Sequence, residues 1–108
     1  MKKQKINPIP LTPTQLQQRQ NQLVVLDARS WLEYLFGHIP NAQRFHPRRI
    51  LNEVSKEQAI AVVCLSGHRS TPVAQWLLKQ GYQKVYNLQG GLIAWKQTGY
   101  KTKFGLQP

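Results

Sequence analysis

Residues 59–72, Ala-Ile-Ala-Val-Val-Cys-Leu-Ser-Gly-His-Arg-Ser-Thr-Pro, contain the pattern that determines the fold class. The first five residues are a continuous apolar run, which predicts a strand buried on both faces. A polar loop follows, and the apolar residues from Val73 to Leu78 have the spacing of an amphipathic helix that stops at Gly81. The stretch therefore predicts a buried strand, a tight loop that begins at Cys64, and a helix.

The same alternation extends in both directions. A capping box predicts a helix from Thr12 to about Asn21, and Leu23-Val24-Val25-Leu26 predicts a second buried strand that ends at Asp27. Further elements are predicted as a helix after Ser30, a strand over 41–45, a helix over 47–54, a strand over 84–88 and a last helix over 92–98. This order predicts an α/β fold with a mainly parallel central sheet and helices on both faces.

The length of 108 residues is typical of one compact domain, without internal repeats or low-complexity segments. We expect residues 1–22 to form an N-terminal strand and helix of that domain, residues 23–100 its core and residues 101–108 a tail. The start is basic, but Ile6-Asn7-Pro8-Ile9-Pro10 stands where a signal peptide would have an apolar run. No stretch is apolar enough to span a membrane, so we expect a cytoplasmic protein without a membrane partner.

The net charge is +11, from 15 Lys and Arg against 4 Asp and Glu. Such a field attracts small anions and nucleic acids alike, so the charge by itself does not select a partner. Part of the excess lies in the tails, where a solvated surface explains it, and no motif interleaves basic and aromatic residues. We expect only weak, non-specific RNA binding, although the cluster of Arg44, Arg48 and Arg49 favours a polyanion.

Cys64 is the single cysteine, so it is either an inert buried thiol or a reactive one. Its position between a strand and a helix start predicts that loop amides and helix N–H groups point at the sulfur, as in an anion-binding nest. Such surroundings lower a thiol pKa from about 8.5 to between about 3.5 and 7.5. Gly67 allows the loop to bend, and Arg69 can offer a planar set of donors to an anion.

At this point the sequence resembles the rhodanese family, from about Leu23 to Tyr100. The motifs that carry the resemblance occur in the family's order: Asp27-Ala28-Arg29, Glu33-Tyr34, Gly37-His38-Ile39-Pro40-Asn41-Ala42, the loop from Cys64 to Arg69 with Ser70, Gly81-Tyr82, Val85, Leu88, Gly90-Gly91 and Ala94-Trp95.

The resemblance implies a sulfurtransferase. Cys64 would take sulfane sulfur from a small anionic donor such as thiosulfate and pass it, through a persulfide, to cyanide or a thiol. The loop residues Leu65, Ser66, Gly67, His68 and Arg69 would bind the substrate, and Arg69 would hold the anionic donor. Asp27, Arg29 and Ser70 would give structural support. No cofactor is implied.

Other functions remain open or are disfavoured by specific features. Four residues separate Cys64 from Arg69, whereas the cysteine-dependent phosphatases of this architecture have five, so the tighter loop favours sulfur transfer. No second Cys or acidic partner lies at ligand spacing from His68, which argues against a metal site. Two alternatives are kept: a persulfide carrier that serves a protein or RNA-modifying partner, and an inactive binding module of the same fold.

The three tryptophans offer a further alternative, since aromatic rings can form a stacking platform for bases. Trp31, Trp76 and Trp95 are instead spaced as core residues of helices. We therefore expect their rings to lie in the core.

Overall fold

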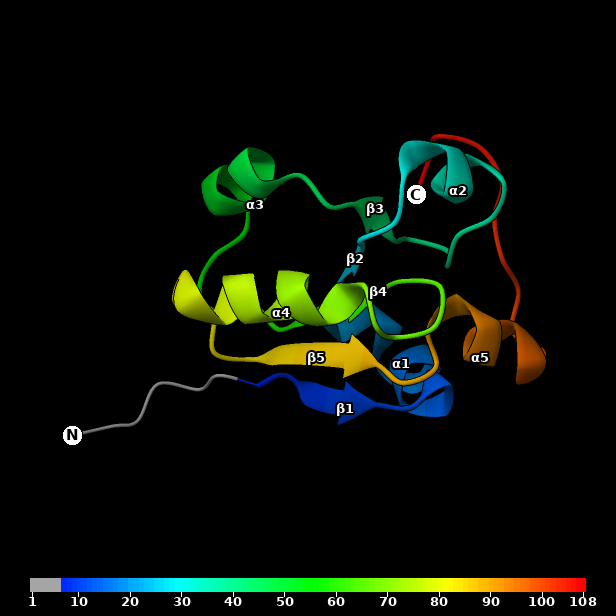
Figure 1. The fold of residues 1–108 in the computed structure, drawn as a ribbon, viewed down its shortest axis with the longest axis horizontal. Coiled ribbons are helices and arrows are strands. Elements are labelled where there is room, and N and C mark those ends of the chain that lie inside the picture. Colours follow the sequence, from blue (N-terminus) through cyan, green and yellow to red (C-terminus); the bar gives the residue numbers. More distant parts are fainter. Residues whose placement is uncertain (1–6) are drawn as a thin grey trace.

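The computed structural model describes residues 7–108, so the predictions made on residues 1–6 lie outside the described part of the chain. Helices and strands alternate along it (Figure 1). In chain order they are β1 (Ile9–Leu11), α1 (Pro13–Arg19), the short 3-10 helix η1 (Gln20–Gln22), β2 (Val24–Asp27), α2 (Trp31–Leu35), β3 (Gln43–Arg44), α3 (Pro47–Glu53), β4 (Ile60–Val63), α4 (Ser70–Lys79), β5 (Val85–Leu88) and α5 (Gly91–Gln97).

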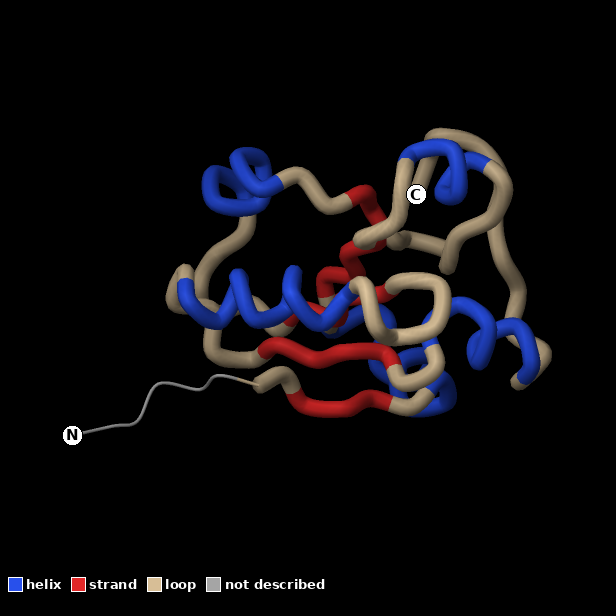
Figure 2. Tube along the Cα trace, in the orientation of Figure 1, coloured by secondary structure: helices blue, strands red, loops and turns tan. Residues whose placement is uncertain are grey.

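The five strands form one sheet in the order β1-β5-β4-β2-β3, and every neighbouring pair is parallel. Figure 2 shows the strands side by side at the centre of the molecule, with loops at both ends. Asp27 at the end of β2 lies in register between Val63 of β4 and Arg44 of β3. Because parallel strands end at a common edge, Cys64 and Asp27 emerge at the same edge of the sheet.

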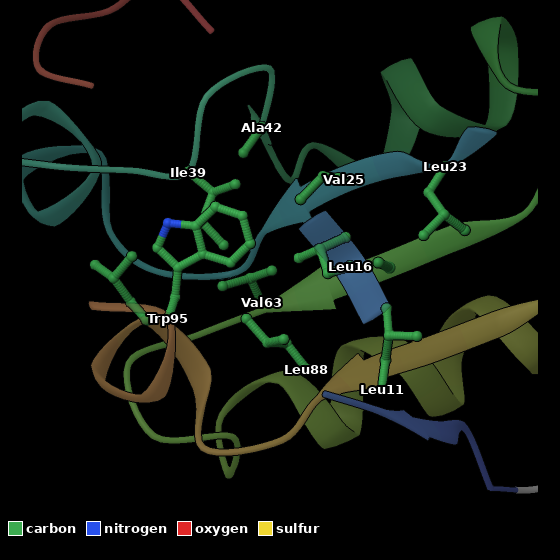
Figure 3. Packing of buried hydrophobic residues seen from close by; sticks show 11 residues of the cluster. Leu11, Leu16, Leu23, Val25, Ile39, Ala42, Val63, Leu88 and Trp95 are labelled. Carbon is green, nitrogen blue, oxygen red and sulfur yellow. The ribbon is translucent and has the colours of Figure 1, made fainter. Parts of the chain in front are cut away.

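Two hydrophobic clusters cover the two faces of the sheet. The first gathers Leu16 of α1 and Leu92 and Trp95 of α5 against alternate strand residues (Figure 3). The second gathers Ile50 of α3 and Ala74, Leu77 and Leu78 of α4 against the other set of strand residues. A sheet buried on both sides explains why β2 and β4 are continuous apolar runs. The predicted α/β fold, with a mainly parallel sheet between helices, is confirmed.

Local signals in the sequence account for the helix starts. Thr12 and Ser30 are N-caps, and each forms a capping box with the Gln or Glu three residues later. Only the first of these two boxes was recognised in the sequence. Pro47 occupies the first turn of α3, where a missing N–H costs nothing.

One expectation about the core is wrong. Trp95 is buried and Trp76 is partly buried, but the side chain of Trp31 is 53% exposed. Trp31 is the first residue of the five-residue helix α2, and it is Tyr34 that this helix buries. A helix of little more than one turn presents one side chain to the core, and the spacing of apolar residues did not show which one. Among the described residues, no helix has the length and apolar character needed to cross a membrane.

Candidate active site around Cys64

Cys64 follows the last residue of β4, and its side chain is fully buried from solvent. The N–H of Gly67 lies 3.0 Å from the Sγ atom and donates a hydrogen bond to it. Helix α4 begins at Ser70, six residues after the cysteine, as the sequence predicts. The loop therefore folds back over the sulfur and presents backbone N–H groups to it.

The surroundings of Cys64 favour the thiolate. Burial raises the pKa of this thiol, because a charged sulfur loses solvation. Hydrogen bonds from the hydroxyl and N–H of Ser70 and from the N–H groups of Gly67 and Ser66 lower the pKa by more than burial raises it. The pKa of Cys64 thus lies below its ordinary value, and a larger share of the sulfur is ionised at neutral pH.

The start of α5 fixes the first two peptide groups of the loop. The N–H of Leu92 donates to the carbonyl oxygen of Cys64 at 2.8 Å, and the N–H of Ile93 donates to that of Leu65 at 3.0 Å. A trans peptide is planar, with its N–H opposite its C=O. Since these carbonyls point at α5, the N–H groups of Leu65 and Ser66 point away from it.

Gly91 makes this contact possible. A Cβ atom at Gly91 would lie 2.4 Å from the oxygen of Cys64 and 2.6 Å from the carbonyl carbon and oxygen of Leu65. Its φ of +59° is also a conformation that glycine adopts at little cost. The helix can approach the loop closely because no side chain intervenes.

A polar cluster under the loop holds the next peptide group. The carbonyl oxygen of Gly67 accepts hydrogen bonds from Thr71 Oγ1 and, at 3.1 Å, from Asn87 Nδ2. Asn87 lies in β5, and its amide also donates to Thr71 Oγ1. Ser70 Oγ lies within hydrogen-bond distance of both the Gly67 oxygen and Asn87 Oδ1. Asn87 therefore joins the sheet, the loop and the first turn of α4.

Arg69 is paired with Glu33 of α2. Its Nη1 and Nη2 atoms donate to the two carboxylate oxygens at 2.9 and 2.7 Å. The hydrogen bonds from Arg69 are the main reason why the pKa of Glu33 falls to about 2. The pair is partly exposed, since 50% of the Arg69 side chain is accessible to solvent. Its contribution to stability is therefore only about 0.5 kcal/mol. The guanidinium thus lies on the exposed side of the loop, with both terminal nitrogens bound to Glu33.

Asp27 and Arg29 form a buried ion pair beside the loop. Arg29 Nη2 lies 2.8 Å from Asp27 Oδ2 and also donates to the carbonyl oxygen of Gly37 at 2.7 Å. The N–H of Arg29 donates to Asp27 Oδ1 as well. The two residues tie the end of β2 to the turn after α2, and neither side chain hydrogen-bonds a residue of the loop.

The remaining predicted site residues lie at the surface. Leu65 is 40% exposed, and Ser66 and His68 are exposed as well.

His38 is buried, stacks on Tyr34 and bonds two carbonyl oxygens, those of Tyr34 and Gln107. Across residues 7–108, no group of three or more His, Cys, Asp or Glu side chains is arranged to hold a metal ion.

Glu33, Asn87 and Gly91 were not identified from the sequence as site residues. Glu33 was assigned only to the family's motif, and the Ser30-x-x-Glu33 spacing of a capping box is a local signal that says nothing of Arg69. Gly90-Gly91 is one of the family's motifs, and Asn87 lies in the strand predicted over 84–88, but neither signal places these residues at the loop. Each contacts the loop only because β5 lies beside β4 and α2 follows β2.

The fold and this loop define a class of α/β protein in which a cysteine ends a central parallel strand within a cradle of backbone amides. Comparison with known proteins gives the family. The model of the rhodanese-like domain matches residues 12–98. A sulfurtransferase from Allochromatium vinosum is 35% identical over 80 residues, which are 71% of this chain and 75% of that protein.

Solved structures agree with this result. The rhodanese-like domain of an Anabaena protein has a TM-score of 0.82 at 25% identity, with 90% of this chain and 80% of that chain covered. A thiosulfate sulfurtransferase from Pseudomonas aeruginosa has a TM-score of 0.81 at 25% identity, with 93% of this chain but only 21% of that chain covered. This chain belongs to the rhodanese-like domain family, whose members include sulfurtransferases.

Proposed function

We propose that this protein transfers sulfane sulfur through a persulfide on Cys64, with thiosulfate or a similar small anion as donor. The single observation that carries the proposal is the position of the thiol. It lies at the end of β4, accepts the N–H of Gly67 at 3.0 Å and has a lowered pKa. A thiolate in a cradle of N–H donors suits both nucleophilic attack and stabilisation of the anion that forms.

The reaction balances without a cofactor. The thiolate of Cys64 attacks the outer sulfur of thiosulfate, the S–S bond of the donor breaks, and sulfite leaves with the bonding electron pair. The outer sulfur then belongs to a persulfide anion, which the N–H groups of the loop stabilise. Cyanide or an acceptor thiolate attacks this sulfur, and the thiolate of Cys64 is released.

Arg69 would bind the anionic donor in this scheme. Its guanidinium is already paired with Glu33, so donor binding has to compete with this carboxylate. The donor has to share the guanidinium with the carboxylate or displace it. Glu33→Gln keeps a hydrogen-bonding partner but removes the negative charge. If Arg69 binds the donor, this variant loads sulfur from thiosulfate at a lower donor concentration, whereas Arg69→Ala needs a higher one.

The test of the proposal is the intact mass of the protein before and after thiosulfate. The expected result is a gain of one sulfur atom, which cyanide or a reductant removes and which Cys64→Ser abolishes. Ser55→Ala, at an exposed position outside the loop, is the matched control and should still be loaded. A wild-type protein that stays unmodified while a known sulfurtransferase is loaded would favour the inactive binding module.

A persulfide carrier for a protein partner is a second proposal. It is supported by exposed apolar side chains in the loop and on the two helices that contact it. The exposed fraction is 40% for Leu65 in the loop, 44% for Ile93 of α5 and 53% for Trp31 of α2. Such side chains suit contact with another protein better than with cyanide. A carrier would pass sulfur to a protein thiol far faster than to cyanide, and Leu65→Ser would slow only the first reaction.

A further inference from the structure

A cavity lies apart from Cys64, between α2, β3, the start of α3 and the C-terminal residues 106–108. Its volume is about 460 Å³, within the range of small-molecule sites. The lining residues are Tyr34, Gln43, Arg44, Phe45, His46, Arg49, Leu106 and Pro108. None of them belongs to the loop from Cys64 to Arg69, so the proposed sulfur transfer leaves this cavity without a role.

The charged side chains that line the cavity are positive. Arg44 and Arg49 contribute two guanidinium groups, and no Asp or Glu lines the cavity. The nearest carboxylate along the sheet, Asp27, already pairs with Arg29. Neither Arg44 nor Arg49 forms a salt bridge within residues 7–108. Burial and the charge of Asp27 raise the pKa of Tyr34, while Arg44 and Arg49 act to lower it, so both guanidinium groups lie near this wall of the cavity.

The guanidinium group of Arg49 is held in place, but one of its N–H donors has no acceptor in the described part of the chain. Arg49 Nη2 donates to the carbonyl oxygen of Arg44 at 2.6 Å, which fixes the guanidinium against β3. Its Nε atom is buried and has no hydrogen-bond partner among the described residues. A buried N–H without an acceptor is costly, and such groups in native structures commonly have an ion or water as partner.

His46 adds a third donor. Its Nδ1 atom accepts the N–H of Arg49 at 3.3 Å, which places the ring proton of the neutral form on Nε2. The remaining lining is apolar, with Phe45, Leu106 and the ring of Pro108. The cavity thus combines cationic donors with a hydrophobic wall.

We propose that this cavity binds a small organic anion, a carboxylate or phosphate carried on an apolar group. The geometry assigns the anionic head to Arg44, Arg49 and His46, and the apolar part to Phe45 and Leu106. An inorganic ion would leave the hydrophobic wall unused, and a neutral ligand would leave the two guanidinium charges without a counter-ion. The proposal does not depend on sulfur transfer by Cys64.

The chain offers a matched control for the charge. Arg48 precedes Arg49 in the same helix, is exposed and does not line the cavity. Arg48→Gln and Arg49→Gln therefore lower the net charge equally, but only the second removes a donor from the cavity. Arg44→Gln, at an exposed lining position, keeps the test available if Arg49→Gln fails to fold.

The experiment is an NMR titration of the ¹⁵N-labelled protein with benzoate, phenyl phosphate, inorganic phosphate and benzyl alcohol. We expect saturable shifts at residues 43–49 for benzoate or phenyl phosphate. Arg49→Gln or Arg44→Gln should weaken this binding by about tenfold or more, because a charge-assisted hydrogen bond is lost. Arg48→Gln should change it by less than about twofold, since an exposed charge is screened.

Three results would overturn the proposal. Equal weakening by Arg48→Gln and Arg49→Gln would mean general electrostatic attraction. Equal affinity for benzyl alcohol or inorganic phosphate would mean that charge and apolar group are not both recognised. Shifts confined to residues 64–70 would place the anion at the cysteine loop instead. The proposed sulfur transfer can fail in the mass experiment without affecting any of these outcomes.

Discussion

The contact between α5 and the loop from Cys64 to Arg69 is tested by Gly91→Ala. A Cβ at this position would lie 2.4 Å from the Cys64 oxygen, whereas real Cβ atoms stay beyond 3.0 Å, so helix and loop must separate by about 0.6 Å. The positive φ adds about 1 kcal/mol for alanine, and overpacking against backbone adds about 1–3 kcal/mol. We expect a loss of about 3 kcal/mol in unfolding free energy.

Gly99→Ala is the matched control. Gly99 has a φ of +92°, but a Cβ there would meet nothing within 4 Å. Gly99→Ala therefore loses only the free energy of the unfavourable backbone conformation, about 1 kcal/mol, because its Cβ collides with nothing. At about 4–8 °C per kcal/mol for a domain of this size, we expect melting temperatures lower by about 5 °C for Gly99→Ala and about 15 °C for Gly91→Ala.

The assay combines thermal unfolding with the pH dependence of Cys64 alkylation by iodoacetamide. Displacing the loop weakens the hydrogen bonds that lower the pKa of the thiol, so Gly91→Ala should move the alkylation midpoint upward. Gly99→Ala should leave this midpoint unchanged. If both variants lose the same stability and keep the wild-type midpoint, the contact of Gly91 with the loop does not position the cradle.

Three further predictions concern the cradle and its rim. Ser70→Ala should raise the alkylation midpoint, since its hydroxyl lowers the pKa of Cys64; an unchanged midpoint would contradict this. In the folded protein the pKa of Glu33 is about 2, below the value of about 4.3 in the unfolded chain. The stability that comes from its pair with Arg69 is therefore complete above about pH 4.3 and is lost as the pH falls through about 2. Unfolding free energies of wild type and Glu33→Gln should accordingly differ by about 0.5 kcal/mol at pH 7 and converge as the pH falls below about 2. Aryl phosphate hydrolysis should be negligible beside sulfur transfer, and phosphatase turnover that requires Cys64 would show that the four-residue loop spacing does not exclude it.

Variants of Arg44, Arg48 and Arg49 also show whether the protein binds a small anion or a polyanion. RNA binding that neutralises several phosphates falls steeply with salt, whereas capture of one small anion depends on salt only weakly. The structure places Arg49 in the wall of a cavity and Arg48 outside it. Tight tRNA binding at physiological salt that requires Arg44, Arg48 and Arg49 together would instead support the carrier that serves an RNA-modifying partner.

The sequence by itself determined the elements and the place of the single thiol. The buried runs at β2 and β4 are recognisable because a parallel sheet covered on both faces has no polar alternation to obscure it. Capping residues and glycines fix helix ends through interactions within a few positions of the chain, so Thr12 and Gly81 could be recognised without a partner. Cys64 at a strand end and a helix start six residues later are likewise local features.

Only the tertiary structure decided which distant residues meet the loop and which side chains reach solvent. Glu33, Asn87 and Gly91 come from three different elements, and their contacts with residues 64–70 depend on the strand order β5-β4-β2. The wrong expectation for Trp31 has a similar origin, because α2 buries Tyr34 and leaves Trp31 exposed. The cavity beside Arg49 likewise exists because residues 103–108 pack against α2 and the turn that follows it. Contacts between residues far apart in the chain leave no periodic or spacing signal in a single sequence.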